Sequence, residues 1–590
     1  MSAGIYQIVP SVVATTPIRS GIPRALESRV PSLLRRGRAV AATFALVFAL
    51  RAAALALLLA TPLASWHLWT ETDEHAYVEW SERLAAGNWA DVPAYRAYFN
   101  WQRDYGPPET WERWYRKNAY YAGPLYPYGL AALRVVFGSP FLPARLLQLL
   151  LACAASAALA AAVQRLLGDG RTAAWCAVAA GVLYGAYGPL VFHDFFLYRD
   201  GPVAHVSTLL IAWPLIARAR SEENEEISSN EGKRAAAQGG WSAFFLGLLG
   251  GLAMLLKQTT APLALASLYS LALSSRSKKS PGGAKRRIAV FGVLGLAIPL
   301  GVLAARNVSA GVPPLTFDTR QAIGLAWGNG FGADATTNPP PGMEEILEEA
   351  AGSTSKTAQL VLDGYRETPL DLPKLFLKKL ATFFNAFEVP DNANFYFFRD
   401  RLPLLQVLPV FSCLLGVGLV GLFAALARGV LRREEGLLAI VAILVPLAAC
   451  LLVQTTSRYR IGVTAPLALG AGLFFLFTFE EIQRGRLRAA GLLVAAAGVL
   501  SLIPLLPSTI PAGRHRFSDT LVYATIVEAQ DGPAAAAAEV RRYLEEGDDD
   551  TRWRVGIAAV RHWAESGDRS NSLVEPEGVA PPGKRLRAPK

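Results

Sequence analysis

Long apolar runs alternate with short polar segments along the chain from about residue 40 to about residue 507. A helix needs about 20 mostly apolar residues to cross the hydrocarbon core of a bilayer, and about 17 is a practical minimum. Runs of this length predict about eleven spanning helices. We expect them at 40–62, 141–164, 172–191, 201–217, 240–256, 259–275, 288–305, 402–427, 436–453, 461–479 and 489–507, with a tight turn at Lys257-Gln258. The predicted fold class is therefore all-α, a polytopic membrane helical bundle.

Composition and charge agree with a membrane protein and argue against other classes. Of the 590 residues, 52% are hydrophobic and only 18% are charged. In soluble domains about a quarter of all residues are charged. The net charge is +11, but the cations cluster between the apolar runs, which is typical of membrane orientation and not of a nucleic-acid partner. The cysteines lie inside apolar runs without CxxC spacing, so we expect no disulfide or zinc framework from Cys153, Cys176, Cys413 and Cys450.

The distribution of Lys and Arg predicts the orientation, because cytoplasmic connectors carry an excess of both. We take residues 1–39 as a cytoplasmic segment before a retained signal anchor. The inside connectors then hold many cations, among them Arg276, Lys278, Lys279, Lys285, Arg286, Arg287, Arg428, Arg432, Arg433, Arg484, Arg486 and Arg488. The short outside connectors hold only Arg199, Lys257, Arg458 and Arg460.

Two long loops, 65–140 and 306–401, fall on the extracytoplasmic side in this topology. The first is rich in Trp and Tyr, which favour the headgroup layer, so we expect it to lie against the membrane. Its last part, 124–138, is apolar but too short to span, and we predict an interfacial helix there. In the second loop, 371–388 has the periodicity of an amphipathic helix, with its lysines mostly opposite the apolar face: Lys374, Lys378 and Lys379.

The chain becomes polar after the spanning domain, 40–507. We predict a small extracytoplasmic helical extension at 508–570, with helices over 517–545 and 551–566. This pattern is that of one tetratricopeptide-like unit, which buries little core by itself. The composition of 571–590 predicts a disordered tail.

Acidic and basic residues coincide at the outer side of this bundle. Asp73 and Glu74 directly follow the first span, and Asp194 and Asp200 lie in the next outer connector. A carboxylate does not readily enter hydrocarbon, so these acids must face an aqueous pocket. The four outer cations oppose the orientation rule, and contact with a lipid phosphate would explain them. Acids that deprotonate a hydroxyl, with cations that neutralise a phosphate leaving group, suit transfer of a group from a lipid phosphate.

Several motifs follow one another in an order that resembles a known family. They are Asp73-Glu74, Pro124-Leu125-Tyr126-Pro127, Gly250-Gly251-Leu252 through Lys257, Arg306-Asn307, Gly324 through Trp327-Gly328-Asn329-Gly330, and Ser457-Arg458-Tyr459-Arg460. Over about residues 40–505 the chain resembles the GT-C superfamily of integral-membrane glycosyltransferases. Within it, the chain is similar to the polyprenyl-phosphate-sugar-dependent type that includes protein O-mannosyltransferases and the aminoarabinose transferase of lipid A.

The resemblance implies a multi-pass hexosyl- or pentosyltransferase of a bacterial inner or plasma membrane, with an extracytoplasmic active site. The implied reaction is inverting transfer of a sugar from a polyprenyl-phosphate-linked donor to a hydroxyl of a protein, lipid or polysaccharide. Asp73 matches the family's first-loop catalytic acid and is the expected general base. Glu74 stands beside it, and Asp200 matches an acid of the second outer loop; both would orient the acceptor or a divalent cation. Whether Mg²⁺ or Mn²⁺ takes part is open, and Asp73 and Asp200 are the candidate ligands.

The resemblance also implies residues that hold the lipid phosphate or the substrate. Lys257 stands where relatives often carry Arg, and Arg458 and Arg460 match a basic pair at the outer end of a late span. Arg199, next to the second-loop acid, and Asn329 are the other binding candidates.

Each of these residues also has a structural interpretation. Acids such as Asp73 are favoured at solvated helix N-termini, and Asp200 before Gly201-Pro202 suits an N-cap. The outer cations suit interfacial anchors that reach water. Arg51, near the middle of the first span, either pairs with another helix or contacts substrate.

Two other functions stay open. A secondary transporter or lipid-linked-sugar flippase would need intramembrane charges and repeated halves with interrupted spans. A non-catalytic scaffold for envelope assembly would dock partners through the C-terminal helices, and substitutions of the carboxylates would then be silent.

Overall fold

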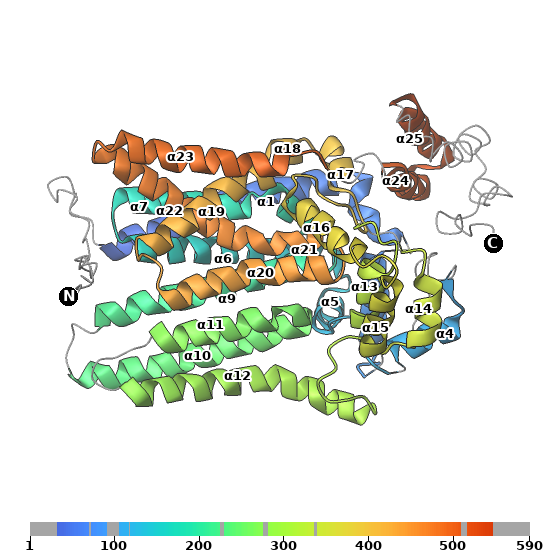
Figure 1. The fold of residues 1–590 in the computed structure, drawn as a ribbon, viewed down its shortest axis with the longest axis horizontal. Helices are drawn as coiled ribbons and strands as arrows, with labels where there is room; N and C mark the ends of the chain where they lie inside the picture. The colour runs from blue at the N-terminus through green and yellow to red at the C-terminus, as the bar shows by residue number, and fades with distance from the viewer. Residues whose placement is uncertain are drawn as a thin grey trace, which may run out of the picture.

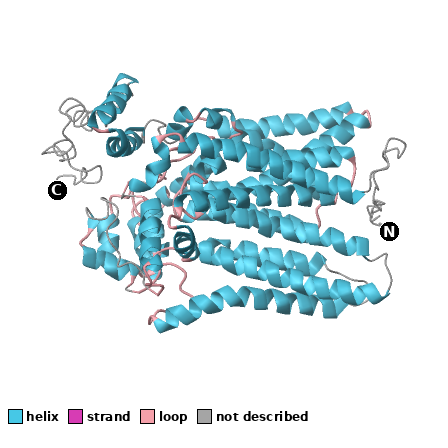
Figure 2. Cartoon of the chain, turned by 180° about the vertical axis from the view of Figure 1, so that it is seen from behind, coloured by secondary structure: helices cyan, strands magenta, loops and turns pink. Residues whose placement is uncertain are grey.

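The computed structural model describes residues 32–69, 72–90, 105–116, 118–224, 229–274, 281–335, 339–508 and 516–546. Helices provide all the regular structure of these ranges, and no β-strand occurs within them, so the all-α prediction is confirmed. The long helices lie side by side, and the short ones gather at one end of this bundle (Figure 1). The same division is visible from behind (Figure 2).

Seven stretches of helix in the described ranges are long and apolar enough to cross a membrane. They belong to α1 (Ser32–Leu59), α6 (Phe141–Leu167), α10 (Ser229–Leu256), α12 (Pro281–Ser309), α20 (Arg433–Leu452), the run of α21 (Ser457–Arg460), η4 (Ile461–Val463) and α22 (Thr464–Gln483), and the run of α23 (Leu487–Leu502) and η5 (Ile503–Leu505). Four further predicted spans fall on shorter or less apolar helices of the same bundle: α7 (Arg171–Gly185), α9 (Asp200–Asn224), α11 (Ala261–Ser274) and α19 (Phe411–Ala427). The count of about eleven therefore stays a prediction.

The short elements come mainly from the two predicted outer loops and the C-terminal extension. The first loop contributes η2 (Pro62–Leu68), α2 (Asp73–Ala85), α4 (Pro108–Tyr115) and α5 (Leu125–Phe137). The second contributes α13 (Arg320–Asn329), α14 (Met343–Ala350), α15 (Thr354–Gly364), α16 (Asp371–Phe384) and α17 (Phe395–Arg401), followed by α18 (Pro403–Val407). The remaining ones are α8 (Gly188–His193), η3 (Gln258–Thr260), α24 (Arg516–Asp531) and α25 (Pro533–Glu546). The predicted tight turn at Lys257 is confirmed, because α10 ends at Leu256 and α11 begins at Ala261.

The interpretation of the aromatic residues in the first outer loop is wrong for four of its tryptophans, whereas Trp89 is 46% exposed. Trp66, Trp80, Trp111 and Trp114 are at most 1% exposed. They pack into the protein; the ring of Trp66, for example, lies 4.9 Å from the ring of Phe398 at a steep angle. These side chains form the core of the short-helix region, where burial of large aromatic surface stabilises the fold, and they do not face the headgroup layer.

Helix α16 is amphipathic as predicted, but one of its lysines is not on the polar face. Lys379 is fully buried. Its Nζ donates hydrogen bonds to Asn329 Oδ1 at 2.8 Å and to the carbonyl oxygens of Leu451 at 2.8 Å and Val453 at 3.1 Å. A cation at these carbonyls satisfies the free acceptors at the C-terminal end of α20. Lys379 therefore ties the amphipathic helix to a spanning helix.

Close packing of small residues fixes the helix that continues from α21. A Cβ atom at Gly421 of α19 would lie 1.8 Å from the carbonyl oxygen of Gly470 in α22, and one at Gly470 would lie 2.0 Å from that of Gly418. Only glycine permits this approach, which is typical of helix pairs in membranes. The position of α22, and of the turn before it, is thereby set by backbone contact.

The C-terminal extension forms a hairpin of α24 and α25, which meet at Gly532. It packs against η2 and α17: Gln530 Nε2 donates to Ser65 Oγ at 2.8 Å, and the rings of Tyr523 and Phe397 lie 5.7 Å apart. The predicted helix over 551–566, the tail 571–590 and most of the segment 1–39 lie outside the described residues.

Candidate active site

The first predicted acid, Asp73, begins helix α2. Thr72 caps this helix, because its hydroxyl accepts a hydrogen bond from the N–H of His75 at 3.2 Å. Asp73 is buried, and its two carboxylate oxygens contact different arginines. Oδ2 lies 2.5 Å from Arg458 Nη1, and Oδ1 lies 3.4 Å from Arg320 Nη1. The start of α2 thus presents a carboxylate to two cations.

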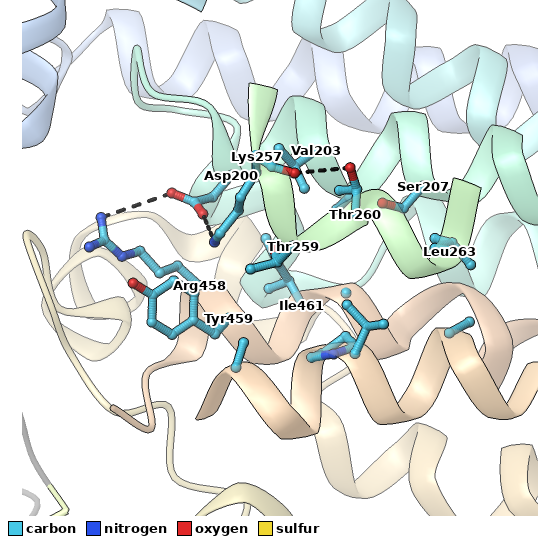
Figure 3. Close-up of a pocket in the computed structure, with 16 residues that line it drawn as sticks. Asp200, Val203, Ser207, Lys257, Thr259, Thr260, Leu263, Arg458, Tyr459 and Ile461 are labelled. Carbon is cyan, nitrogen blue, oxygen red and sulfur yellow. Dashed lines mark hydrogen bonds and ion pairs between the residues drawn. The ribbon is translucent and has the colours of Figure 1, made fainter. Parts of the chain in front are cut away.

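The second predicted acid, Asp200, begins α9 and meets the same cluster (Figure 3). Its Oδ1 accepts a hydrogen bond from Lys257 Nζ at 2.8 Å, and its Oδ2 lies 3.9 Å from Arg458 Nη1. Lys257 lies in the break between α10 and α11, and its ammonium lies 4.0 Å from the centroid of the Tyr459 ring, a cation–π contact. Asp73 and Asp200, far apart in the sequence, therefore share Arg458.

A third carboxylate, Asp391, also contacts Arg458. Its Oδ2 lies 2.6 Å from Arg458 Nε. Asp391 lies in the irregular segment between α16 and α17, next to two backbone anchors. The N–H of Ser457 donates to the Val389 carbonyl at 3.0 Å, and Trp66 Nε1 donates to the Asn392 carbonyl at 3.3 Å. The guanidinium of Arg458 is thus surrounded by three carboxylates from three parts of the chain.

Arg199 lies on the Lys257 side of this arrangement. Its Nη1 donates to the carbonyl oxygen of Leu256 at 3.1 Å and lies 4.0 Å from Asp318 Oδ2. Asp318 also accepts a hydrogen bond from Gln258 Nε2 at 3.2 Å. Arg199 therefore supports the break that carries Lys257. We refer to the eight charged residues together as the Arg458 cluster: Asp73, Asp200, Asp318, Asp391, Arg199, Lys257, Arg320 and Arg458.

Burial and opposite charge compete in setting the ionisation of this cluster. Burial raises the pKa of Asp73, but Arg458 and Arg320 lower it further, so that the pKa falls well below its usual range. Burial also raises the pKa of Asp200, and Lys257 with Arg458 bring it down to about 2. For Lys257 burial prevails over the charge of Asp200 and lowers its pKa to about 8. Asp73 and Asp200 are therefore both ionised at neutral pH.

A cavity of about 50 Å³ adjoins the cluster between α9, α11, α20 and η4. Asp200, Lys257 and Arg458 form its charged end (Figure 3). The rest of the wall is mainly aliphatic, from Val203, Ala204, Leu263, Ala442, Val445, Pro446, Ala449 and Ile461. The charged cluster thus opens directly onto an apolar space between spanning helices.

Glu74 does not join the Arg458 cluster. Its Oε1 accepts a hydrogen bond from the N–H of Leu197 at 2.9 Å and lies 3.9 Å from Arg145 Nη2. Arg145 in turn donates to the carbonyl oxygens of Phe195 at 3.0 Å and Ala64 at 2.7 Å. Burial raises the pKa of Glu74 to about 7. The Glu74 side chain therefore connects α2 to the second outer connector through Leu197.

Arg460 and Asn329 also lie in other networks. Arg460 Nη2 lies 2.6 Å from Glu388 Oε1, and the guanidinium donates to backbone carbonyls in the last turn of α16 and just after it: Phe383, Asn385 and Phe387. Asn329 is buried and donates to the Leu452 carbonyl at 2.7 Å, while its Oδ1 accepts from Lys379. Arg460 thus holds the segment that leads to Asp391, and Asn329 helps to cap α20.

Sequence reasoning missed Asp391, Asp318 and Arg320. All three lie in the long second loop, where single charged residues are common and the orientation rule counts little. The only available signal was position. Arg320 begins a helix, and Asp391 follows Pro390, just after the predicted amphipathic helix. Their meeting with Arg458 is a tertiary contact that no local pattern encodes.

A second charged cluster lies deeper in the bundle. Arg51 of α1 pairs with Asp194 Oδ2 and donates from Nε to the Gly185 carbonyl at 2.9 Å. His205 Nε2 lies 2.9 Å from Asp194 Oδ2, and its Nδ1 lies 2.8 Å from Tyr184 Oη. Arg51 therefore pairs with other elements of the bundle, which is the first of its two interpretations. We call these four side chains the Arg51 cluster: Arg51, Asp194, His205 and Tyr184.

A divalent cation was left open, with Asp73 and Asp200 as its ligands. Across the parts of the chain that the structure describes, no three His, Cys, Asp or Glu side chains converge as metal ligands. Asp73 already faces two arginines, and Asp200 faces Lys257 and Arg458. Mg²⁺ needs oxygen ligands whose charge is available to it. These two residues do not fit a metal site in this arrangement.

No protein-family model and no curated protein sequence matches the chain. Among solved structures, the Archaeoglobus fulgidus oligosaccharyltransferase in the apo form matches 88% of this chain and 61% of its own, with 14% identity and a TM-score of 0.37. The same enzyme tethered with an acceptor peptide through a disulfide bond matches 70% of this chain and 50% of its own, with 16% identity and a TM-score of 0.33. The chain thus spans less than two thirds of these structures, and a likeness of this extent says nothing about shared activity.

Proposed function

We propose that the protein is a membrane glycosyltransferase. It transfers a sugar from a polyprenyl-phosphate-linked donor to a hydroxyl of a protein, lipid or polysaccharide, at the extracytoplasmic face and with inversion. The observation that carries this proposal is the Arg458 cluster, in which Asp73 and Asp200 meet Arg458 and Lys257 at the end of a helical bundle. A base for a hydroxyl and cations for a phosphate are the groups that this reaction needs.

Asp73 is the general base of the proposed reaction. Its carboxylate is ionised because Arg458 and Arg320 hold its pKa below the usual range. The acceptor hydroxyl gives its proton to Asp73 while its oxygen forms a bond to the anomeric carbon. The bond from that carbon to the phosphate oxygen breaks, its electron pair stays on the phosphate, and polyprenyl phosphate leaves from the opposite face.

Arg458 and Lys257 neutralise the charge that develops on the leaving phosphate. Lys257 acts as a point charge held in place by Asp200, and Arg458 offers a planar set of donors. A phosphate bound to Arg458 would share the guanidinium with Asp73 and weaken the attraction between Arg458 and this carboxylate. The pKa of Asp73 would then rise toward the value that a general base needs, so donor binding would activate the base.

The apolar wall of the cavity supports a lipid donor. Val203, Leu263 and Val445 line the space that begins at Lys257 and runs between α9, α11 and α20. A phosphate at the charged end would therefore have its first isoprene units next to aliphatic side chains, and their burial would contribute about 25 cal/mol per Å². A free phosphorylated sugar would make no use of this wall.

The test has two stages. Mass spectrometry of envelope glycans from cells with and without the protein identifies the sugar and the acceptor. Reconstituted protein is then assayed with the matching polyprenyl-phosphate sugar, and Asp73→Asn lowers turnover about 10²–10⁴-fold, because a positioned base contributes that much. Glu82→Gln is the matched control, since Glu82 is an exposed acid of the same helix that pairs with the half-buried Arg134. Full activity of Asp73→Asn would exclude the proposed base.

A transporter or flippase of lipid-linked sugars is the second candidate. The Arg51 cluster favours it, because ionisable groups inside a bundle are typical of transport pathways. The assay is movement of a labelled polyprenyl-phosphate sugar across proteoliposomes that lack an acceptor. A transporter moves the lipid under these conditions, whereas the proposed glycosyltransferase leaves its distribution unchanged and acts only when acceptor is added.

A further inference from the structure

We propose that Asp391 occupies the place on Arg458 that the donor phosphate takes, and that the phosphate enters by displacing this carboxylate. The inference rests on the function proposed above and concerns the same site before the donor binds. It assigns Asp391 a role that the sequence did not suggest, as the residue that sets the affinity for the donor.

The contacts of Arg458 show the competition directly. An arginine binds an anion most strongly through neighbouring N–H groups along one edge of the guanidinium. Asp391 Oδ2 lies 2.6 Å from Nε, while Nη1 faces Asp73 at 2.5 Å and Asp200 at 3.9 Å. One donor of each edge of the Arg458 guanidinium, Nε on one and Nη1 on the other, is therefore in contact with a carboxylate.

The charge balance of the Arg458 cluster favours the release of one carboxylate when an anion binds. Its four carboxylates, on Asp73, Asp200, Asp318 and Asp391, face four cations, on Arg199, Lys257, Arg320 and Arg458. With all eight groups ionised, four positive and four negative charges sum to zero, although burial raises the pKa of Asp391. A phosphate diester adds one negative charge to this buried site, and burial of an uncompensated charge is expensive. Moving one carboxylate out to water restores the balance.

Asp391 is the carboxylate best placed to leave. Asp73 and Asp200 begin helices α2 and α9, where the helix dipole favours a negative charge. Asp391 lies in irregular backbone, and its side chain is 17% exposed, against 8% for Asp73 and 5% for Asp200. Water therefore reaches Asp391 more readily than it reaches the other two.

The segment around Asp391 is anchored on both sides, so the displacement needs only a local movement. On one side the Ser457 N–H holds the Val389 carbonyl, and on the other Trp66 Nε1 holds the Asn392 carbonyl. The Asp391 carboxylate itself contacts Arg458 as its ion-pair partner. Rotation of this one side chain toward solvent would free Nε without disturbing the anchors.

The test measures binding of polyprenyl phosphate to the full chain in nanodiscs. This lipid is the leaving product of the proposed reaction and carries no sugar. Asp391→Asn removes the competing charge and keeps the side-chain shape, so it binds the polyprenyl phosphate about tenfold more tightly than the unmodified protein. Asp391→Glu keeps the charge and stays within about twofold of the unmodified affinity. Asp371→Asn is the control for net charge, because Asp371 is an exposed acid of α16 that pairs with Lys374. This variant should bind polyprenyl phosphate with unchanged affinity.

The outcomes separate this inference from the function on which it rests. Equal or weaker binding by Asp391→Asn, with the unmodified protein still binding the lipid, overturns the role of Asp391 and leaves the glycosyltransferase proposal standing. Failure of every variant to bind a polyprenyl phosphate overturns both. If Asp391 were only a structural brace, Asp391→Asn would bind more weakly and would also lower the unfolding temperature.

Discussion

Asp194 and Asp200 lie in one short connector, yet they enter two different charged clusters. Asp194 belongs to the Arg51 cluster, where its partners Arg51 and His205 are at most 3% exposed, and none of the three lines the cavity beside the Arg458 cluster. Asp200 belongs to the Arg458 cluster, where it lines a cavity together with Lys257 and Arg458.

The difference lies in what each cluster leaves available. The Arg51 cluster is a closed set of contacts that joins α1, α7 and α9, and a Cβ on Gly201 would lie 2.1 Å from Asp194 Oδ1. It fixes the start of α9, from which Asp200 projects. The Arg458 cluster lies beside an apolar space, where we propose that an anionic lipid exchanges with one of its carboxylates. We therefore expect substitutions to separate stability from activity.

The largest expected effect is on stability, from Asp194→Ala. This change leaves Arg51 buried without its carboxylate, and breaking a buried pair in this way costs about 3–5 kcal/mol. The unfolding midpoint in detergent, followed by tryptophan fluorescence, should fall sharply. A variant as stable as the unmodified protein would show that the Arg51 cluster does not hold the fold.

Asp200→Asn should have the opposite profile. It weakens the contact that orients Lys257, and displacement of a positioning group by about 1 Å can lower a rate about 10²-fold. Its unfolding midpoint should move less than that of Asp194→Ala, because Asn still accepts a hydrogen bond from Lys257. Transfer assays and melting curves on the two variants, side by side, would test the distinction. If Asp200→Asn lost as much stability as Asp194→Ala, the distinction between the two clusters would be wrong.

The pH dependence of the proposed reaction should report Lys257. Burial lowers its pKa to about 8, so the free protein loses this cation as the pH rises through about 8. Because a neutral amine does not hold a phosphate, kcat/KM for the donor should fall about tenfold for each pH unit above that value. Lys257→Arg should retain activity at higher pH, since a guanidinium stays protonated. An unchanged alkaline limb in Lys257→Arg would mean that another group titrates.

The smallest expected effect is from removal of the C-terminal hairpin. The hairpin contacts η2 and α17 and not the Arg458 cluster, so truncation after residue 515 should change transfer by less than about tenfold, or 1.4 kcal/mol. The scaffold hypothesis expects the reverse, with function lost on truncation and retained in Asp73→Asn. Complementation of a deletion strain by both variants distinguishes the two.

The sequence predicts the features that depend on local pattern. Apolar run length locates the helices of the bundle, and the break at Lys257 follows from two adjacent runs. The meeting of Asp73, Asp200, Lys257 and Arg458 was also expected, because outer acids and misplaced outer cations share one side of the bundle. These predictions rest on the cost of placing charge and backbone in hydrocarbon.

Features that depend on tertiary partners were not predicted. Lys379 has a helical spacing that suggests a polar face, yet it is buried because the carbonyls at the end of α20 need a donor. Arg460 looks equivalent to Arg458, but the turn of α21 directs it to Glu388. The only local signal of Asp391 is its position after the amphipathic helix. In each case the side chain's role is decided by an element distant in sequence.

The most direct test of the proposed phosphate site is a cryo-EM structure of the protein in nanodiscs with bound polyprenyl phosphate. We expect the phosphate to contact Lys257 and Arg458, with the isoprenoid chain along Val203 and Leu263 and with Asp391 turned away from Arg458. A phosphate bound at Arg460, or at the opposite end of the bundle, would contradict it.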